Sequence, residues 1–100
     1  MNRDTDPISI SRRPERQRYE LEIAGTLAAF ADYRPDSGRV TFLHTEVLPQ
    51  HEGKGLGSQL ARYALDDTRA RKLKVAAQCE FIAGYIERHP QYQDLLVGQN

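Results

Sequence analysis

The chain has 100 residues, of which 39% are hydrophobic, and its acidic and basic side chains balance to a formal net charge of zero at neutral pH. This length fits one compact domain, and the absence of net charge argues against a general nucleic-acid or membrane binder. A small anionic ligand remains compatible with local charge. The single cysteine, Cys79, excludes an intramolecular disulfide and is typical of a reducing compartment.

Targeting signals are not evident. No apolar run has a length near the roughly 18 residues that a membrane-spanning helix needs. The N-terminal residues also lack the apolar centre of a signal peptide. We therefore expect a cytoplasmic protein. Residues 1 to 16 are polar and contain Pro7 and Pro14, which predicts a mobile arm, with a short edge strand over "ISIS" as the alternative. The folded domain is then expected at residues 17 to 97.

Three antiparallel strands are predicted after this arm. Apolar and charged residues alternate over residues 18 to 24, and residues 26 to 34 form a second β-prone run before the turn residues "PDSG" at 35 to 38. Residues 39 to 49 form the longest run. Strict alternation places Val40, Phe42, His44 and Glu46 on one face and Thr41, Leu43, Thr45 and Val47 on the other.

Helices and one further strand are predicted in the second half of the chain. Residues 56 to 71 carry an apolar stripe at helical spacing, consisting of Leu56, Leu60, Ala61, Ala64 and Leu65. Residues 73 to 79 read as a strand that runs parallel to an earlier one. A final helix over residues 80 to 88 turns Phe81, Ile82, Tyr85 and Ile86 inward, and the tail packs through Tyr92, Leu95 and Leu96. The order β-β-β-α-β-α predicts one α+β domain.

The segment "EGKGLG", residues 52 to 57, joins the third strand to the first helix. A helix N-terminus leaves backbone N–H groups unpaired at the positive end of its dipole, and glycines allow an anion to approach them. Phosphate is the usual ligand, and a tight turn without a ligand is the alternative. The P-loop pattern G-x-x-x-x-G-K-[ST] is absent, and the dinucleotide pattern G-x-G-x-x-G lacks its last spacing.

The stretch "TEVLPQHEGKGLGSQL" resembles the acetyl-CoA-binding motif of the GCN5-related N-acetyltransferases. That motif is Gln or Arg, two residues, Gly, one residue, then Gly or Ala, and it falls on residues 52 to 57. Val47 and Pro49 match the family upstream, whereas Glu52 departs from Gln or Arg; a second register starting at Gln50 fits literally but places the helix start less well. "HTEV", "EGKGLG" and "C…YIERHP" occur in the order typical of a very small, single-domain branch, over residues 18 to 92.

The resemblance implies a GNAT-like three-layer α+β fold that binds acetyl-CoA. The strands at residues 39 to 48 and 73 to 79 would splay apart, and main-chain groups of Val47 and Leu48 would contact the pantetheine arm. The pyrophosphate would lie on the amides of the glycine turn, with Glu52 pointing away. Residues matching that turn are Gly53, Lys54, Gly55, Leu56, Gly57 and Ser58, and Arg88, His89 and Tyr92 would border the adenine or the pantetheine.

Acetyl transfer to an amine needs two proton steps, because the ammonium must lose a proton and the leaving thiolate must gain one. Glu46 and His44 are the candidate bases, and a surface carboxylate and a core histidine are the alternatives. The resemblance puts Tyr85 at the position of the family's general acid, although a core aromatic fits equally. Cys79 is a second candidate, as a thiol that takes up acetyl transiently, against the alternative of a buried apolar cysteine.

These expectations combine into three hypotheses. The first is a small N-acetyltransferase with an unidentified amine acceptor on a protein or peptide, because no extra N-terminal helices are readable to build an acceptor pocket. The second is a CoA or acyl-CoA binding module with little or no transfer activity, and the third is an interaction domain with a purely structural turn. We expect a monomer or weak dimer. No metal site is expected, because His51 and His89 lack ligand partners at metal spacing.

Overall fold

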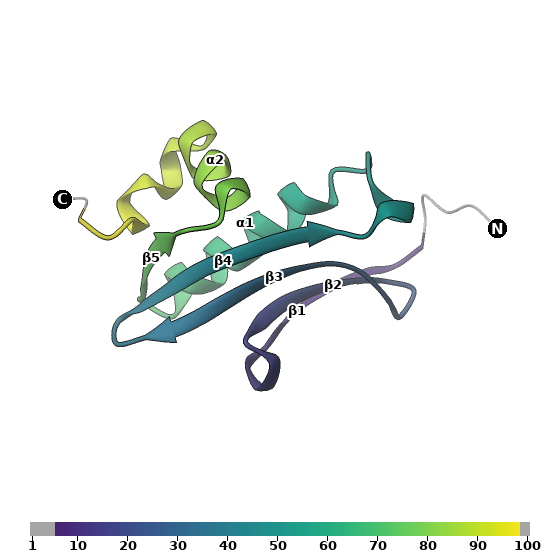
Figure 1. The fold of residues 1–100 in the computed structure, drawn as a ribbon, viewed down its shortest axis with the longest axis horizontal. Coiled ribbons are helices and arrows are strands. Elements are labelled where there is room, and N and C mark those ends of the chain that lie inside the picture. Colours follow the sequence, from purple (N-terminus) through teal and green to yellow (C-terminus); the bar gives the residue numbers. More distant parts are fainter. Residues whose placement is uncertain (1–5, 99–100) are drawn as a thin grey trace.

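The computed structural model describes residues 6–98 and contains a five-stranded sheet in the order β1-β2-β3-β4-β5 (Figure 1). Strands β1 to β4 pair with one another in antiparallel orientation, and β5 runs parallel to β4. The elements along the chain are β1 (Ile8–Arg13), η2 (Pro14–Arg16), β2 (Arg18–Ile23), β3 (Thr26–Asp36), β4 (Arg39–Val47), η3 (Pro49–His51), α1 (Leu56–Ala70), β5 (Lys74–Ala77), α2 (Glu80–Arg88) and η4 (Pro90–Leu95). The α+β class, the parallel last strand and both helices are therefore confirmed.

The first strand corrects the expectation of a mobile N-terminal arm. Residues 8 to 13 pair with β2 along its whole length, from Ile8 opposite Ile23 to Arg13 opposite Arg18. Ile10 packs against the core from this edge. The alternative of an edge strand is thus correct, and the strand covers residues 8 to 13. The predicted order β-β-β-α-β-α was therefore one strand short at its N-terminal end. Residues 1 to 5 of the expected arm lie outside the described residues.

The main core lies between the sheet and α1, which passes behind the strands in Figure 1. The predicted stripe of α1 is confirmed, because all five of its members are buried. Tyr19 of β2 packs beneath this helix and donates a hydrogen bond of 2.6 Å from its hydroxyl to Asp67. Burial and this carboxylate raise the pKa of Tyr19 far above its ordinary value. Asp67 also lies 3.9 Å from Arg71, one turn further along α1.

A register shift in β4 corrects the predicted assignment of its faces. Tyr33 of β3 lies opposite Phe42, but the preceding residue Asp32 lies opposite His44, so Leu43 is an extra residue in β4. Such a bulge reverses the alternation beyond it, because directly opposed residues share a face. His44 and Glu46 therefore lie on the face opposite Phe42, and Thr45 and Val47 lie on the face of Phe42. The opposite assignment expected from strict alternation was wrong.

The C-terminal segment gathers at the β5 end of the sheet (Figure 1). The bounds of α2 agree with the predicted helix, and Tyr92 and Leu95 of η4 are buried as expected. The hydroxyl of Tyr92 donates to Asp66 of α1 at 2.7 Å, and Val97 N–H donates to the carbonyl of Val75 at 2.9 Å. These bonds fasten the tail to both α1 and β5. Between residues 6 and 98, no helix is long and apolar enough to cross a membrane.

Candidate functional site

Strands β4 and β5 diverge at the middle of β4. Their parallel register ends at Phe42 opposite Ala77, and the N–H groups of Gln78 and Cys79 both donate to the carbonyl of Phe42, at 3.0 and 2.9 Å. Beyond this point β4 continues to Val47 without a strand on that side in the described part of the chain. The gap is a hollow of about 500 Å³ lined by Leu43, His44, Thr45, Gln78, Cys79, Glu80 and Phe81.

The glycine turn forms a second hollow, of about 230 Å³. Gly53 and Gly55 have φ angles of 83° and 73°, a left-handed conformation that favours glycine, and nothing lies within 4 Å of a Cβ added to either. Among residues 6–98, no backbone carbonyl outside the regular helical pattern accepts from the amides of residues 53 to 58, and α1 has no side-chain N-cap. The open space above the turn therefore faces unpaired donors at a helix N-terminus.

Gly57 serves a different purpose from the other two glycines. A Cβ at this position would lie 2.7 Å from Cζ of Phe81, so the absence of a side chain lets the phenyl ring rest against the first turn of α1. Phe81 is 37% exposed and lines both hollows. The prediction that Phe81 points into the core was wrong, and its ring instead forms the wall common to the two hollows.

Cys79 lies at the base of the larger hollow, where β5 leads into α2. It is the N-cap residue of α2 and only 5% exposed, and its Sγ lies 3.3 Å from Oγ1 of Thr45. The bulge at Leu43 makes this contact possible, because it turns Thr45 to the face that strict alternation had assigned to His44. The thiol is thus held between a hydroxyl group and the first turn of a helix.

His44 and Glu46 are in contact on the opposite face of β4. Nε2 of His44 lies 3.1 Å from Oε1 of Glu46, and the two side chains are 58% and 46% exposed. The ring of Phe30, on β3, lies 6.2 Å from that of His44. His44 also lines the larger hollow, so the hollow opens toward this face of the sheet.

Four of the predicted residues lie apart from both hollows. Tyr85 is 5% exposed, and its ring stacks on His89 with a centroid distance of 3.9 Å, while Nδ1 of His89 donates to the carbonyl of Tyr85 at 2.7 Å. Tyr92 packs beside them, and burial followed by its bond to Asp66 raises the pKa of Tyr92 to about 12. Arg88 is exposed at the end of α2. None of these four is a lining residue of the two hollows.

The remaining predicted residues gather at the turn. Val47, Glu52, Gly53, Gly55, Leu56, Gly57 and Ser58 line the smaller hollow. Lys54 is exposed and forms no ion pair among the described residues, and Leu48 is half-buried, its N–H donating to Ala28. Glu52 lines the hollow, so the expectation that it points away from the turn is not supported by its position.

Sequence reasoning missed Leu43, Thr45 and Phe81 as members of the site, and it discussed His51 only as a metal ligand. His51 lines the smaller hollow, and its Nδ1 is buried without a hydrogen-bond partner in the described structure. A residue in the first turn of a helix can face the end of a neighbouring strand, and this was the available signal for Phe81. The bulge at Leu43 leaves no comparable trace in the sequence.

Three comparisons with known proteins agree with this geometry. A model of the GCN5-related N-acetyl-transferase family matches residues 18–95. Protein NATD1 of Mus musculus is 30% identical over 91 residues, which cover 89% of this chain and 83% of the mouse protein. A GCN5-like putative N-acetyltransferase from Staphylococcus aureus has the same fold, with a TM-score of 0.69 at 24% identity over 92% of this chain and 90% of its own.

The ribosomal-protein-S18-alanine N-acetyltransferase from Escherichia coli is also similar, with a TM-score of 0.57 at 26% identity over 64% of this chain and 43% of its own. The family match and these structural neighbours identify the protein class as an acyltransferase, and its splayed sheet and open strand-to-helix turn agree with that class. The chain belongs to the GCN5-related N-acetyltransferase family, whose general reaction is acetyl transfer from acetyl-CoA.

Proposed function

We propose that this protein binds acetyl-CoA along the two hollows and transfers its acetyl group to an amine. The observation that carries the proposal is the wall shared by the hollows: Phe81 lines both, so the amide turn and the splay between β4 and β5 adjoin. One hollow offers donors for an anion, and the other ends at a thiol and an imidazole. This arrangement suits a long ligand with a phosphate part and a reactive part.

The residues present fit the diphosphate of such a ligand. Gly53 and Gly55 leave the turn open to a close approach, and the amides of residues 53 to 58 have no competing backbone acceptor outside the helical pattern in the described chain. Lys54 adds a positive charge on the exposed side of the turn, while Glu52 requires that the ligand avoid its carboxylate. The bound cofactor would supply the activated acetyl thioester.

The larger hollow fits the pantetheine arm and the reacting thioester. Edge N–H and C=O groups of β4 beyond Phe42 can pair with an extended ligand, as in the addition of a strand to a sheet. Val47 and Leu48 lie at the turn end of this edge, and Leu43 and Phe81 present exposed apolar surface at its mouth. The arm would thereby run from the amide turn toward Cys79.

Proton transfer can be assigned to the side chains around the hollow. When the amine nitrogen attacks the thioester carbonyl, a C–N bond forms and the C–S bond breaks. Before the attack, the ammonium loses one proton to the Glu46 and His44 pair. After the C–N bond has formed, the nitrogen loses a second proton, and the departing CoA thiolate takes up one proton. Because Cys79 lines the hollow and Tyr85 does not, the thiol of Cys79 is the better-placed group for direct contact, either as proton donor or as a transient acetyl carrier.

A specific observation also favours the binding-module alternative. The side chains of His44 and Glu46 are 58% and 46% exposed, so no enclosed acceptor pocket surrounds them. The measurement that separates the alternatives is CoA-thiol release from acetyl-CoA with a panel of amines and peptides. We expect turnover above the rate of spontaneous hydrolysis, and saturable binding without turnover would establish the module instead.

Two variants then test the residue roles. Cys79→Ala should retain acetyl-CoA affinity and lose most of the turnover, and mass spectrometry of the wild type should show whether Cys79 gains an acetyl group. Tyr85→Phe is the matched comparison, because it alters a hydroxyl outside both hollows. Wild-type rates in Cys79→Ala combined with lost turnover in Tyr85→Phe would reverse the assignment.

A further inference from the structure

The sheet face opposite α1, which we call the open face, has a strongly divided charge. Two rows of side chains cross it in register: Ser11, Glu20, Phe30 and Glu46 in one row, and Arg13, Arg18, Asp32 and His44 in the next. Of the described helices, only α1 makes extensive contact with β1 and β2, and it does so on the other face. The β1–β2 part of the open face is therefore free of a covering helix among the described elements, and His44, on the same face, lines the larger hollow.

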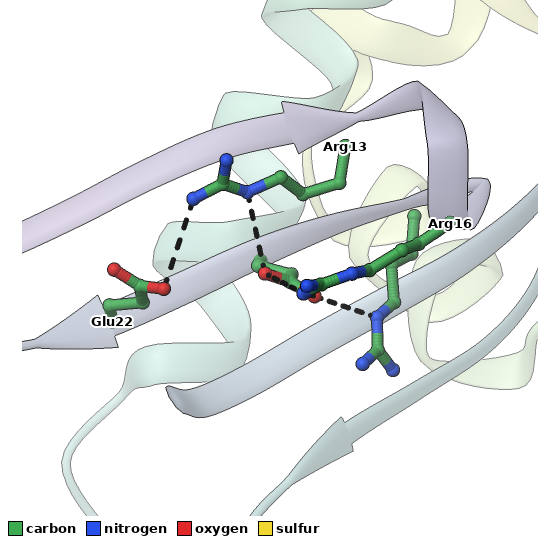
Figure 2. Close-up of polar contacts among 5 residues, drawn as sticks. Arg13, Arg16 and Glu22 are labelled. Carbon is green, nitrogen blue, oxygen red and sulfur yellow. Dashed lines mark hydrogen bonds and ion pairs between the residues drawn. The ribbon is translucent and has the colours of Figure 1, made fainter. Parts of the chain in front are cut away.

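The β1–β2 half of this face is a platform of arginines. The carboxylate of Glu20 is 2% exposed and accepts from Arg16 at 2.9 and 3.2 Å and from Arg18 at 2.9 Å. Figure 2 shows Arg13 beside this group, 3.4 Å from Glu20 and 3.9 Å from Glu22. Three arginines are paired with Glu20 and Glu22, with Glu15 as a further carboxylate near Arg16. Most guanidinium N–H groups of these arginines still have no protein acceptor within residues 6–98.

The part of β3 and β4 next to the reactive hollow is acidic, because Arg34 and Arg39 lie farther along the same face and pair with Asp36 at 3.6 and 3.8 Å. Asp32 forms no ion pair with another described residue, and the only ion pair of Glu46 among these residues is with the imidazole of His44. Phe30 lies between the two halves, with the guanidinium of Arg18 4.4 Å from its ring centroid. A cation is therefore favoured near His44, and anions are favoured at Arg13 and Arg16.

We propose that the open face docks an extended protein segment whose reactive amine enters at Asp32 and Glu46 while an acidic side chain of the same segment contacts the arginine platform. This inference rests on the proposed function for the identity of the reacting amine. The platform lies two to three strand spacings from β4, or about 10 to 14 Å, which corresponds to about three to four residues of extended chain. The preferred acceptor is thus an amine with an acidic residue about three to four positions away.

The test is a titration of the isotopically labelled full chain with matched peptides, followed by NMR. Each peptide carries one lysine and, about three to four residues away on both sides, glutamates, glutamines or arginines. A further peptide replaces the lysine by a free N-terminal amine, which distinguishes the two sources of the amine. We expect shifts at Arg18, Phe30 and Glu46 with the glutamate peptides, and affinities that fall from glutamate through glutamine to arginine peptides.

Two variants locate the contacts on the protein. Arg13→Gln removes a platform charge but keeps the hydrogen bonds of Arg16 and Arg18 to Glu20, and it should weaken the glutamate peptides about two- to fivefold. Arg62→Gln, on the exposed side of α1 where its side chain is 75% exposed, is the matched control and should change nothing. Asp32→Asn should weaken the binding of every amine-bearing peptide by a similar factor. This second variant keeps the test possible if the Arg13 variant folds poorly.

The inference is overturned if the arginine peptides bind as well as the glutamate peptides, or if the shifts fall on α1. The titration runs with and without acetyl-CoA, and cofactor binding is recorded by calorimetry. Failure of cofactor binding alone contradicts the proposed function, whereas selective docking of acidic peptides still supports the open face as the contact surface.

Discussion

Gly55 and Gly38 have the same φ angle of 73°, and neither has a neighbouring atom within 4 Å of an added Cβ. Gly55 precedes α1 in the candidate site, and Gly38 lies in the turn between β3 and β4. Replacing either by alanine imposes the same left-handed conformation on a residue with a side chain. This pair therefore separates the backbone cost of the substitution from its effect on a ligand.

The stability cost follows from the conformation alone. A left-handed alanine costs about 1 to 2 kcal/mol, and each kcal/mol lowers the midpoint of thermal unfolding by about 4 to 8 °C in a domain of this size. Because no atom blocks the new methyl group at either site, Gly55→Ala and Gly38→Ala should lose similar stability. Thermal unfolding of both variants in parallel measures this equality.

Ligand affinity should distinguish the two variants. The methyl group of Gly55→Ala occupies the open space above the turn, and the loss of one hydrogen bond between an amide and a charged phosphate costs about 1.5 to 3 kcal/mol. We expect acetyl-CoA to bind about ten- to a hundredfold more weakly to Gly55→Ala, and with wild-type affinity to Gly38→Ala. Equal affinities in the two variants would refute the assignment of the turn as the phosphate site.

Three further predictions concern the surroundings of the site. Gly57→Ala should displace the ring of Phe81, which lies 2.7 Å from the added Cβ, and weaken acetyl-CoA binding; a second substitution, Phe81→Ala, should relieve the added strain. Tyr92→Phe should cost about 1.5 kcal/mol at neutral pH. The pKa of Tyr92 is raised from 10.0 to about 12. The stabilisation by its hydroxyl group is therefore complete below pH 10 and disappears as the pH rises from 10 to 12. Over that range, the wild type should lose more stability than Tyr92→Phe. Glu20→Gln should lower the free energy of unfolding by about 2 kcal/mol, because it leaves the neighbouring arginines without their ion pair. The loss is limited because these arginines are partly exposed and can be rehydrated. The control Glu22→Gln, at a more exposed carboxylate, should be nearly neutral.

Each of these outcomes has a direct check. Strictly additive effects of Gly57→Ala and Phe81→Ala on the free energy of unfolding would show that the two positions do not touch. Identical pH slopes for the wild type and Tyr92→Phe between pH 10 and 12 would contradict the titration of that hydroxyl. Burial opposes ionisation of Glu20, but the bonds from Arg16 and Arg18 outweigh it and lower its pKa. Stability from Glu20 is therefore lost as pH falls below 4.5, and Glu20→Gln should unfold with a weaker acid dependence.

Local patterns accounted for much of the fold. The alternation in β2 and the helical spacing in α1 each reflect a physical requirement within one segment, and the structure agrees with both predictions. The predicted turn at residues 35 to 38 proved shorter, because Pro35 and Asp36 continue β3 and pair with Val40 and Arg39. At the site, the glycine turn was readable because left-handed residues before a helix favour glycine.

The corrections came from contacts between segments that are distant in the sequence. The bulge at Leu43 is set by the pairing of β4 with β3, and one extra residue reverses the faces of His44, Thr45 and every residue after them. The contact of Phe81 with Gly57 depends on the divergence of β5 from β4, whereas the apolar spacing within residues 80 to 88 predicted a core position for Phe81. The edge strand β1 has too little apolar content to be distinguished from an arm without its partner β2.

The central claim is that acetyl-CoA binds with its diphosphate on the amides of residues 53 to 58. The most direct measurement is an NMR titration of the isotopically labelled protein with acetyl-CoA, which reports affinity and location together. We predict saturable one-to-one binding, with the largest amide shifts at Gly53, Gly55 and Ser58 and further shifts at Thr45 and Cys79. An absence of shifts at millimolar acetyl-CoA, or shifts confined to residues outside the two hollows, would contradict the account.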